Sequence, residues 1–156
     1  MSLASPFGAT VLIAASCVLN WTVGIGLYQN FVVIPSWFAN PPAPFARINH
    51  FGSSEVRFWI PMQSITVLAL ITALAVGWND PVHKPLIIAA LAFYLDAIGM
   101  TGAYLAPKIV RWGKMSPTNG GAPEFLAAGN RWMVLSWVRQ GVMVIAGVLL
   151  LTALAV

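Results

Sequence analysis

Charged side chains are scarce in this sequence. Lys, Arg, Asp and Glu together supply 8% of its 156 residues, whereas soluble domains carry about 25%. A chain of this length keeps much of its surface in contact with solvent, so a large buried core does not account for the deficit. Hydrophobic residues reach 59%, and the 7 Trp are of the kind that gathers at membrane–water interfaces. The composition predicts an integral membrane protein.

Cysteine and histidine are nearly absent, which excludes several kinds of site. Cys17 is the only cysteine, so neither an internal disulfide nor a thiolate metal cluster can form. The two histidines, His50 and His83, fall at opposite ends of the predicted helices and cannot both ligate one haem. The sequence has no clustered metal ligands, Gly-rich phosphate loop or nucleophile elbow. We therefore expect no metal and no cofactor.

Long apolar segments alternate with short polar or proline-rich stretches. The first segment lacks a positive n-region and is too long for a signal peptide, so we expect a retained helix. Prolines 41, 42 and 44 predict a loop over 36–53, and a second loop covers 113–122. The four segments, each long enough to cross a bilayer, are 6–35, 54–78, 84–112 and 123–155. The fold class that follows is all-α: one transmembrane domain, 1–156, forming an up-down-up-down four-helix bundle.

The few basic residues lie mostly at one end of the predicted bundle. Lys84 stands alone at the end that holds the turn after segment two. By the positive-inside rule, loops 36–53 and 113–122 are cytoplasmic and both termini lie outside. No basic block occurs, so no nucleic-acid partner is expected. The basic residues near the two loops are Arg47, Arg57, Lys108, Arg111, Lys114 and Arg131.

Polar residues within the segments share one leaflet. They occupy the end of segment one, the start of segment two, the second half of segment three and the start of segment four, which antiparallel helices bring together. We expect a polar recess that opens toward the loops. Its predicted ligand-binding residues are Asn20, Tyr28, Gln29, Asn30, Glu55, Trp59, Gln63, Trp132, Ser136 and Trp137.

Arg139 is the central residue of the predicted recess. A cation at this depth in a bilayer costs at least about 2.5–3.5 kcal/mol unless it finds a partner or water. Asp96, which is deep in segment three, is the expected counter-ion, and Tyr28 or Tyr104 is expected to shuttle a proton. The predicted catalytic residues are thus Arg139, Asp96 and Tyr104. In the alternative interpretation, the same polar groups only tie the helices together through hydrogen bonds.

Pro107 lies inside segment three, where it is expected to kink the helix or loosen a turn, because a proline lacks the N–H of a regular helical turn. The same segment carries small residues at Gly99 and Ala103 and at Gly102 and Ala106. Such pairs allow close association of helices in membranes.

Three stretches carry a resemblance to a known family: residues 26–37 (GLYQNFVVIPSW), 58–63 (FWIPMQ) and the tryptophan-rich start of segment four, with Arg131-Trp132 and Trp137-Val138-Arg139. In these the chain resembles small four-helix bacterial membrane proteins related to anthrone oxygenases. The resemblance implies the four-helix fold, a bacterial inner membrane, an important Arg139 and an oxygenase activity.

Two functions are consistent with these features. In the first, the protein binds or oxidises a flat, apolar phenolic or quinone-like molecule taken from the lipid, with tryptophans stacking on its rings and Arg139 stabilising an oxyanion. In the second, it is a non-catalytic accessory subunit of a larger membrane complex or a homo-oligomer. A solute conduit is disfavoured, because the opposite leaflet offers no polar path.

Overall fold

The computed structural model describes Leu3 and residues 5–38, 44–113 and 123–156; within these ranges the side chains of 44–56, 113 and 123–125 are not described. The elements in chain order are α1 (Pro6–Tyr28), η1 (Gln29–Val33), α2 (Ile34–Phe38), α3 (Pro44–Val76), α4 (His83–Met100), η2 (Thr101–Leu105), α5 (Ala106–Gly113) and α6 (Pro123–Ala155). The two elements labelled η are π-helices.

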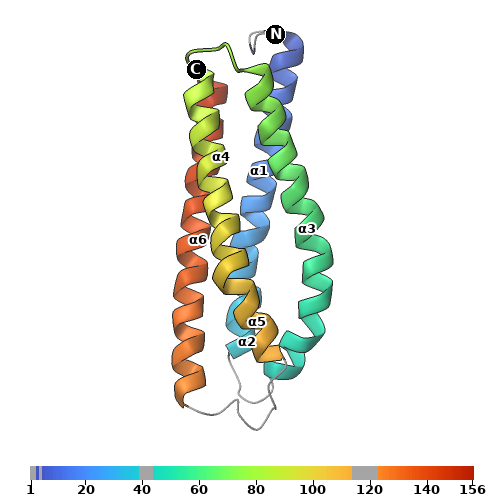
Figure 1. The fold of residues 1–156 in the computed structure, drawn as a ribbon, viewed down its shortest axis with the longest axis vertical. Helices are drawn as coiled ribbons and strands as arrows, with labels where there is room; N and C mark the ends of the chain where they lie inside the picture. Colours follow the sequence, from blue (N-terminus) through green and yellow to red (C-terminus); the bar gives the residue numbers. More distant parts are fainter. Residues whose placement is uncertain (1–2, 4, 39–43, 114–122) are drawn as a thin grey trace.

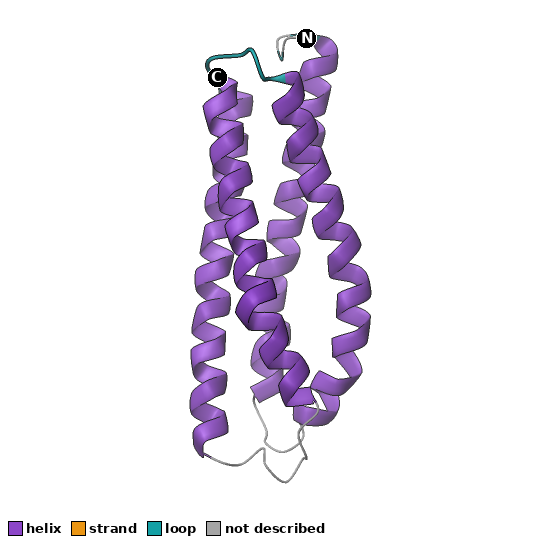
Figure 2. Ribbon diagram, viewed as in Figure 1, coloured by secondary structure: helices purple, strands orange, loops and turns teal. Residues whose placement is uncertain are grey.

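The four predicted helices are present and run antiparallel (Figure 1). Nearly all of the described backbone is helical, and both termini lie at one end of the bundle (Figures 1 and 2). We call the half near the termini the terminal half, and the half that contains η1, α2 and α5 the loop half.

Four helices are long and apolar enough to cross a membrane, which confirms the predicted transmembrane bundle. Their mean hydropathies are 1.8 to 1.9. The candidate spans are Pro6–Phe38, Arg57–Val76, His83–Trp112 and Leu126–Ala155. The prediction of an all-α membrane protein thus agrees with the structure.

The boundary between the first two helices differs from the prediction. The sequence predicted a loop over 36–53, but α2 continues to Phe38 and α3 already begins at Pro44. Pro44 occupies the first position of α3, where its missing N–H removes no hydrogen bond. The chain also stays helical through Pro61, inside α3. Prolines 41 and 42 and the predicted loop 113–122, apart from Gly113, lie outside the described residues.

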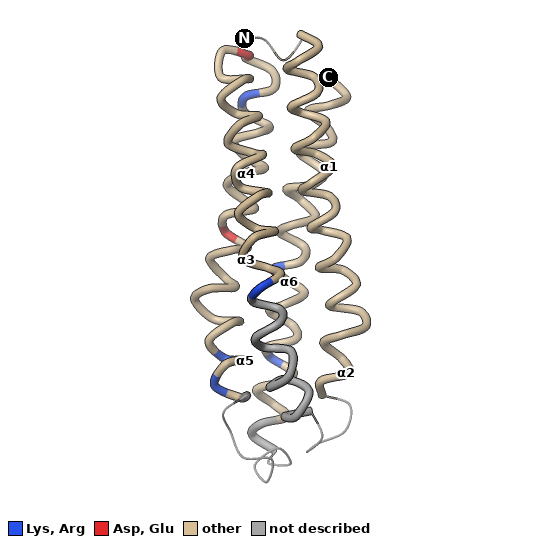
Figure 3. The backbone as a smooth tube through the Cα atoms, turned by 90° about the vertical axis from the view of Figure 1, so that its right-hand side faces the viewer, with Lys and Arg blue, Asp and Glu red and all other residues tan. Residues whose placement is uncertain are grey.

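Small side chains pack the terminal half. Ala73, Ala90 and Ala146 are fully buried between the helices and let their backbones approach closely. Larger apolar residues such as Leu19 and Leu150 fill the space between them. In contrast, most of the described Lys and Arg residues lie in the loop half (Figure 3). The two halves therefore differ in polarity, as the sequence predicted.

Gly129 provides a test of the packing between α6 and α2. A Cβ atom at this position would lie 2.7 Å from the Phe38 ring, whereas one at Gly141, on the same helix, would meet nothing within 4 Å. We expect Gly129→Ala to destabilise the protein by about 1–3 kcal/mol through overpacking. Gly141→Ala is the matched control, and we expect it to be neutral or slightly stabilising. Thermal unfolding in detergent measures both, and equal melting temperatures would contradict the packing described.

Asp80 provides a pH-dependent test at the turn before α4. Its Oδ1 lies 2.9 Å from His83 Nδ1 and accepts hydrogen bonds from the N–H groups of Val82 and His83. The close contact with the His83 imidazole, followed by the backbone hydrogen bonds, holds the pKa of Asp80 below its usual value. A carboxylate with a lowered pKa stabilises the fold above its unfolded pKa, about 3.9, and loses this effect as the pH falls.

We therefore expect Asp80→Ala to lower the melting temperature at pH 7, with a difference from wild type that shrinks as the pH falls from about 5 toward 3. Asn79→Ala, in the same turn and exposed, is the control that should show no such pH dependence. A difference of the same size at pH 3 and pH 7 would rule out the ionised carboxylate as the cause.

Candidate functional site

Two π-helices shape the loop half, and each ends just before a proline. In η1 the N–H of Ile34 donates to the Gln29 carbonyl, and in η2 the N–H of Ala106 donates to the Thr101 carbonyl. Pro35 and Pro107 follow these two donors directly. A proline has no N–H to offer and its ring crowds the preceding turn, so a wider turn relieves the clash. The loosened turn expected near Pro107 is therefore observed, and Pro35 produces the same feature on the first helix.

A cavity of about 260 Å³ lies between the helices at the level of the π-helices. Both π-helices contribute lining residues, Gln29 from η1 and Thr101 and Leu105 from η2, and so do the residues that follow them, Ile34 and Ala106. The remaining lining residues come from α2, α3, α5 and α6: Trp37, Trp59, Ile60, Gln63, Ile109, Val110, Trp132, Ser136 and Arg139. All four transmembrane helices thus contribute to one cavity.

Arg139 reaches the cavity from the middle of the α6 span. It is half-buried, and its Nη1 lies 3.5 Å from Thr101 Oγ1. The Thr101 hydroxyl donates its own proton to the Ala97 carbonyl, at 2.8 Å. The lone pairs of Thr101 Oγ1 therefore face the guanidinium. This arrangement holds a positive charge against the cavity within the membrane.

Two further polar groups of the lining are buried and have no hydrogen-bond partner among the described residues. Trp37 is 2% exposed and Ser136 is fully buried, and both Trp37 Nε1 and Ser136 Oγ lack a partner. An unsatisfied buried donor costs about 1–3 kcal/mol. Native proteins keep few such groups, so two in one cavity call for an explanation.

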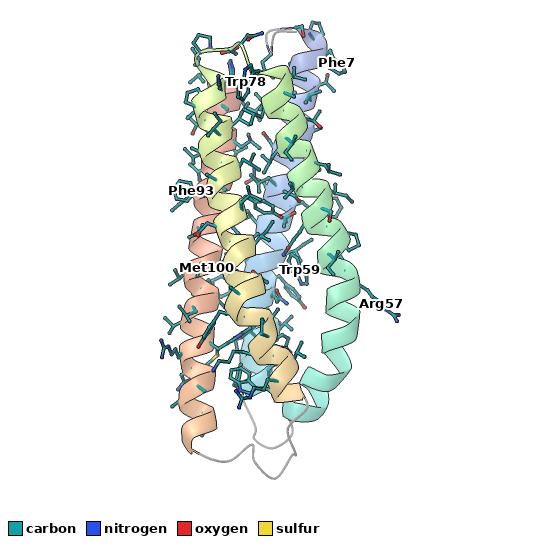
Figure 4. The ribbon with its side chains drawn as sticks, viewed as in Figure 1. Phe7, Arg57, Trp59, Trp78, Phe93 and Met100 are labelled. Atoms are coloured by element: carbon teal, nitrogen blue, oxygen red, sulfur yellow. The ribbon has the colours of Figure 1, made fainter. Side chains whose placement is uncertain are left out.

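Aromatic rings form the wall of the cavity toward the loops. The Trp37 and Trp132 rings lie 6.0 Å apart, and Trp112 and Trp132 lie 6.3 Å apart, with Phe38 at the edge of Trp112. Trp132 Nε1 donates to the Leu105 carbonyl, at 3.0 Å, and so joins α6 to η2. Trp59 lines the cavity from α3, and Figure 4 shows it between α3 and the helices opposite. The aromatic wall is therefore both a support for the cavity and a flat surface within it.

The structure brings six of the residues predicted from the sequence to the cavity. These are Gln29, Trp59, Gln63, Trp132, Ser136 and Arg139.

The other predicted residues lie elsewhere. Asn20 and Asn30 donate from Nδ2 to the carbonyls of Ser16 and Gly26, one turn back in their own helix. Tyr28 is 60% exposed, and Trp137 is 40% exposed with its ring against Phe31.

Tyr104 does not line the cavity; the Lys108 Nζ lies 5.5 Å from the centre of its ring. Glu55 belongs to α3, but its side chain lies outside the described residues, as do the side chains of His50 and Arg47.

Asp96 is exposed on α4 and is not a lining residue, so the predicted pairing with Arg139 is wrong. The guanidinium faces Thr101 instead. Asp96 precedes η2 by five residues, about 140° around an α-helix, so its side chain points to a different side of the helix from that of Thr101. The carboxylate therefore faces the surroundings of the bundle.

Trp37 and Thr101 are lining residues that the sequence did not reveal as such. Trp37 falls in the loop predicted over 36–53, because the predicted first segment ends at Pro35. Thr101 is not among the residues predicted for the site. The spacing of each proline from the preceding polar residue, Gln29 six residues before Pro35 and Thr101 six residues before Pro107, is the signal that could have found both π-helices.

Comparison with known proteins gives no match: no family model, no curated protein and no solved structure is significantly similar to this chain.

Trp132→Phe tests the hydrogen bond that joins α6 to η2. The substitution keeps an aromatic ring but leaves the Leu105 carbonyl, in a residue that is 2% exposed, without its partner. We expect a loss of about 1–3 kcal/mol in stability, measured by unfolding in detergent. Trp21→Phe is the control, because Trp21 is 69% exposed. If both variants unfold at the wild-type temperature, the bond contributes nothing.

Proposed function

We propose that the protein binds a flat lipophilic molecule with oxygen substituents, of the phenolic or quinone class, in the cavity of the loop half. The observation that carries this proposal is the convergence of Arg139 with tryptophan rings on one cavity within the predicted membrane spans. Small-molecule sites are mostly apolar pockets with a few placed polar groups, and they start near 300 Å³. The cavity of about 260 Å³ is close to that size and suits one ring system.

The chemistry of the lining supports this class of ligand. Trp59, Trp37 and Trp132 offer rings that stack on or edge against a planar molecule. Arg139 stabilises negative charge on a ligand oxygen, and the apolar surroundings strengthen that interaction. A phenolate is a better electron donor than the phenol, so the same contact suits the oxygenase activity that the family resemblance implies.

A second function, as a subunit of a larger membrane complex or a homo-oligomer, is favoured by the outer face of α4 and η2. Asp96 and Ala103 are exposed there, and a Cβ at Gly99 or Gly102 would meet nothing within 4 Å. A carboxyl group exposed on a membrane span is costly unless another polar group meets it. A helix of another chain would cover this face and could supply that group.

The distribution of basic residues supports a placement of the loop half at the cytoplasmic face of the membrane, and the family resemblance implies a bacterial inner membrane. Lys108, Arg111 and Arg131 belong to this half, whereas Lys84 lies at the other end, with its Nζ 3.9 Å from the Trp78 ring.

Arg139→Ala tests the binding proposal. We expect the dissociation constant of 2-methyl-1,4-naphthoquinone, measured with the protein in nanodiscs, to rise at least about tenfold, because a hydrogen bond from a charged donor contributes about 1.5–3 kcal/mol. Arg131→Ala is the matched control: Arg131 lies about two turns earlier on α6, is exposed and does not line the cavity. Equal affinity in wild type and Arg139→Ala would refute the proposed role.

A further inference from the structure

The rim and the interior of the cavity differ in chemistry. Ile60 of α3 and Val110 of α5 line the cavity and are 62% and 51% exposed. Ala106, also a lining residue, is exposed beside Val110. All three belong to predicted membrane spans, so their exposed surfaces face lipid acyl chains. The cavity therefore opens sideways, through an apolar rim, toward the lipid near the loop end of the candidate spans.

The arrangement of helices fits this opening. Figure 1 shows α3 bowed outward from the rest of the bundle in the loop half, and Figure 4 shows the Trp59 side chain on the inner side of that bow. Ile60 follows Trp59 directly and points outward, as its exposure shows. Two neighbouring residues of α3 thus mark the inside and the edge of the same opening.

The buried end of the cavity presents hydrogen-bond donors. Trp37 Nε1 is a donor only, and it is buried without a partner among the described residues. Ser136 Oγ, also buried without such a partner, can donate as well, and the Arg139 guanidinium has only donors. Trp132 Nε1 is already bound to the Leu105 carbonyl. The group that complements the two donor-only side chains, Trp37 and Arg139, is therefore a hydrogen-bond acceptor.

We propose that the ligand is a membrane quinone that enters sideways between α3 and α5, places a carbonyl oxygen at Trp37 and Ser136, and leaves its isoprenoid tail between Ile60 and Val110. This inference rests on the proposed function and adds the direction of access and the class of ligand. A quinone carbonyl accepts hydrogen bonds from several donors at once. The apolar isoprenoid tail of the quinone partitions among the lipid acyl chains. A neutral phenol would instead bring a proton that neither the Trp37 N–H nor the Arg139 guanidinium can accept.

The test uses the full chain in nanodiscs and two tritiated probes with the same naphthoquinone head, one with an isoprenoid tail and one without. Empty nanodiscs correct for partition into lipid. The double variant Ile60→Trp/Val110→Trp narrows the rim, and Val110→Trp alone replaces it if the double variant does not fold. Leu68→Trp is the matched control, because Leu68 is on α3, is 62% exposed and does not line the cavity.

We expect the rim variant to bind the tailed quinone at least about tenfold more weakly than wild type, while the tail-less quinone and the Leu68→Trp control change less than about twofold. Unchanged binding of the tailed quinone would overturn sideways access but leave the proposed function standing. Failure of wild type to bind either probe would overturn both.

Trp37→Phe tests the recognition of the carbonyl separately. Loss of one neutral hydrogen bond should weaken binding of both quinones about three- to tenfold. For 1-methylnaphthalene, which has no acceptor, the variant and wild type should bind equally. An equal loss for the quinones and the hydrocarbon would show that Trp37 acts through packing alone, and would overturn the assignment of an acceptor to this end.

Discussion

The missing N–H groups of Pro35 and Pro107 are the constraint on which the loop half depends. Within a bilayer, a helix must satisfy its backbone hydrogen bonds internally, since no water is available to replace them. The chain meets this requirement by widening the turn before each proline into a π-helix. A wider turn changes which residues face the bundle axis, and it brings Gln29 and Thr101 to the same cavity. The break in regularity thus produces the space between the helices.

The aromatic cluster keeps that space from collapsing. Trp132 is fixed by its bond to the Leu105 carbonyl, and its ring is in turn packed against Trp37 and Trp112. Rings held by several neighbours lose little further entropy when a ligand arrives, which favours binding through preorganisation. Arg139 then lies beside a rigid wall, with Thr101 facing its guanidinium.

The long apolar segments and the scarcity of charge were sufficient to predict the bundle, but the sequence predicted only part of the cavity. Trp59 and Gln63, four residues apart, were both predicted as ligand-binding residues, and both line the cavity. Asn20 and Asn30 were predicted for the site but do not line the cavity. A side-chain amide in a helix can donate a hydrogen bond to a carbonyl one turn back, so it need not face a site. Asp96 was expected to pair with Arg139 because both lie deep in their segments, but depth alone does not say which side of the helix a carboxylate faces, and Asp96 is exposed.

The packing of the terminal half has a consequence for proton balance. Between the level of Tyr94 and the termini, the bundle axis is filled by side chains such as Leu12, Ala73, Ile87 and Leu150. None of these can pass a proton to a neighbour, so they interrupt any relay along the axis. A proton taken up or released beside Arg139 therefore has no path of hydrogen-bonding side chains toward the termini through these apolar layers.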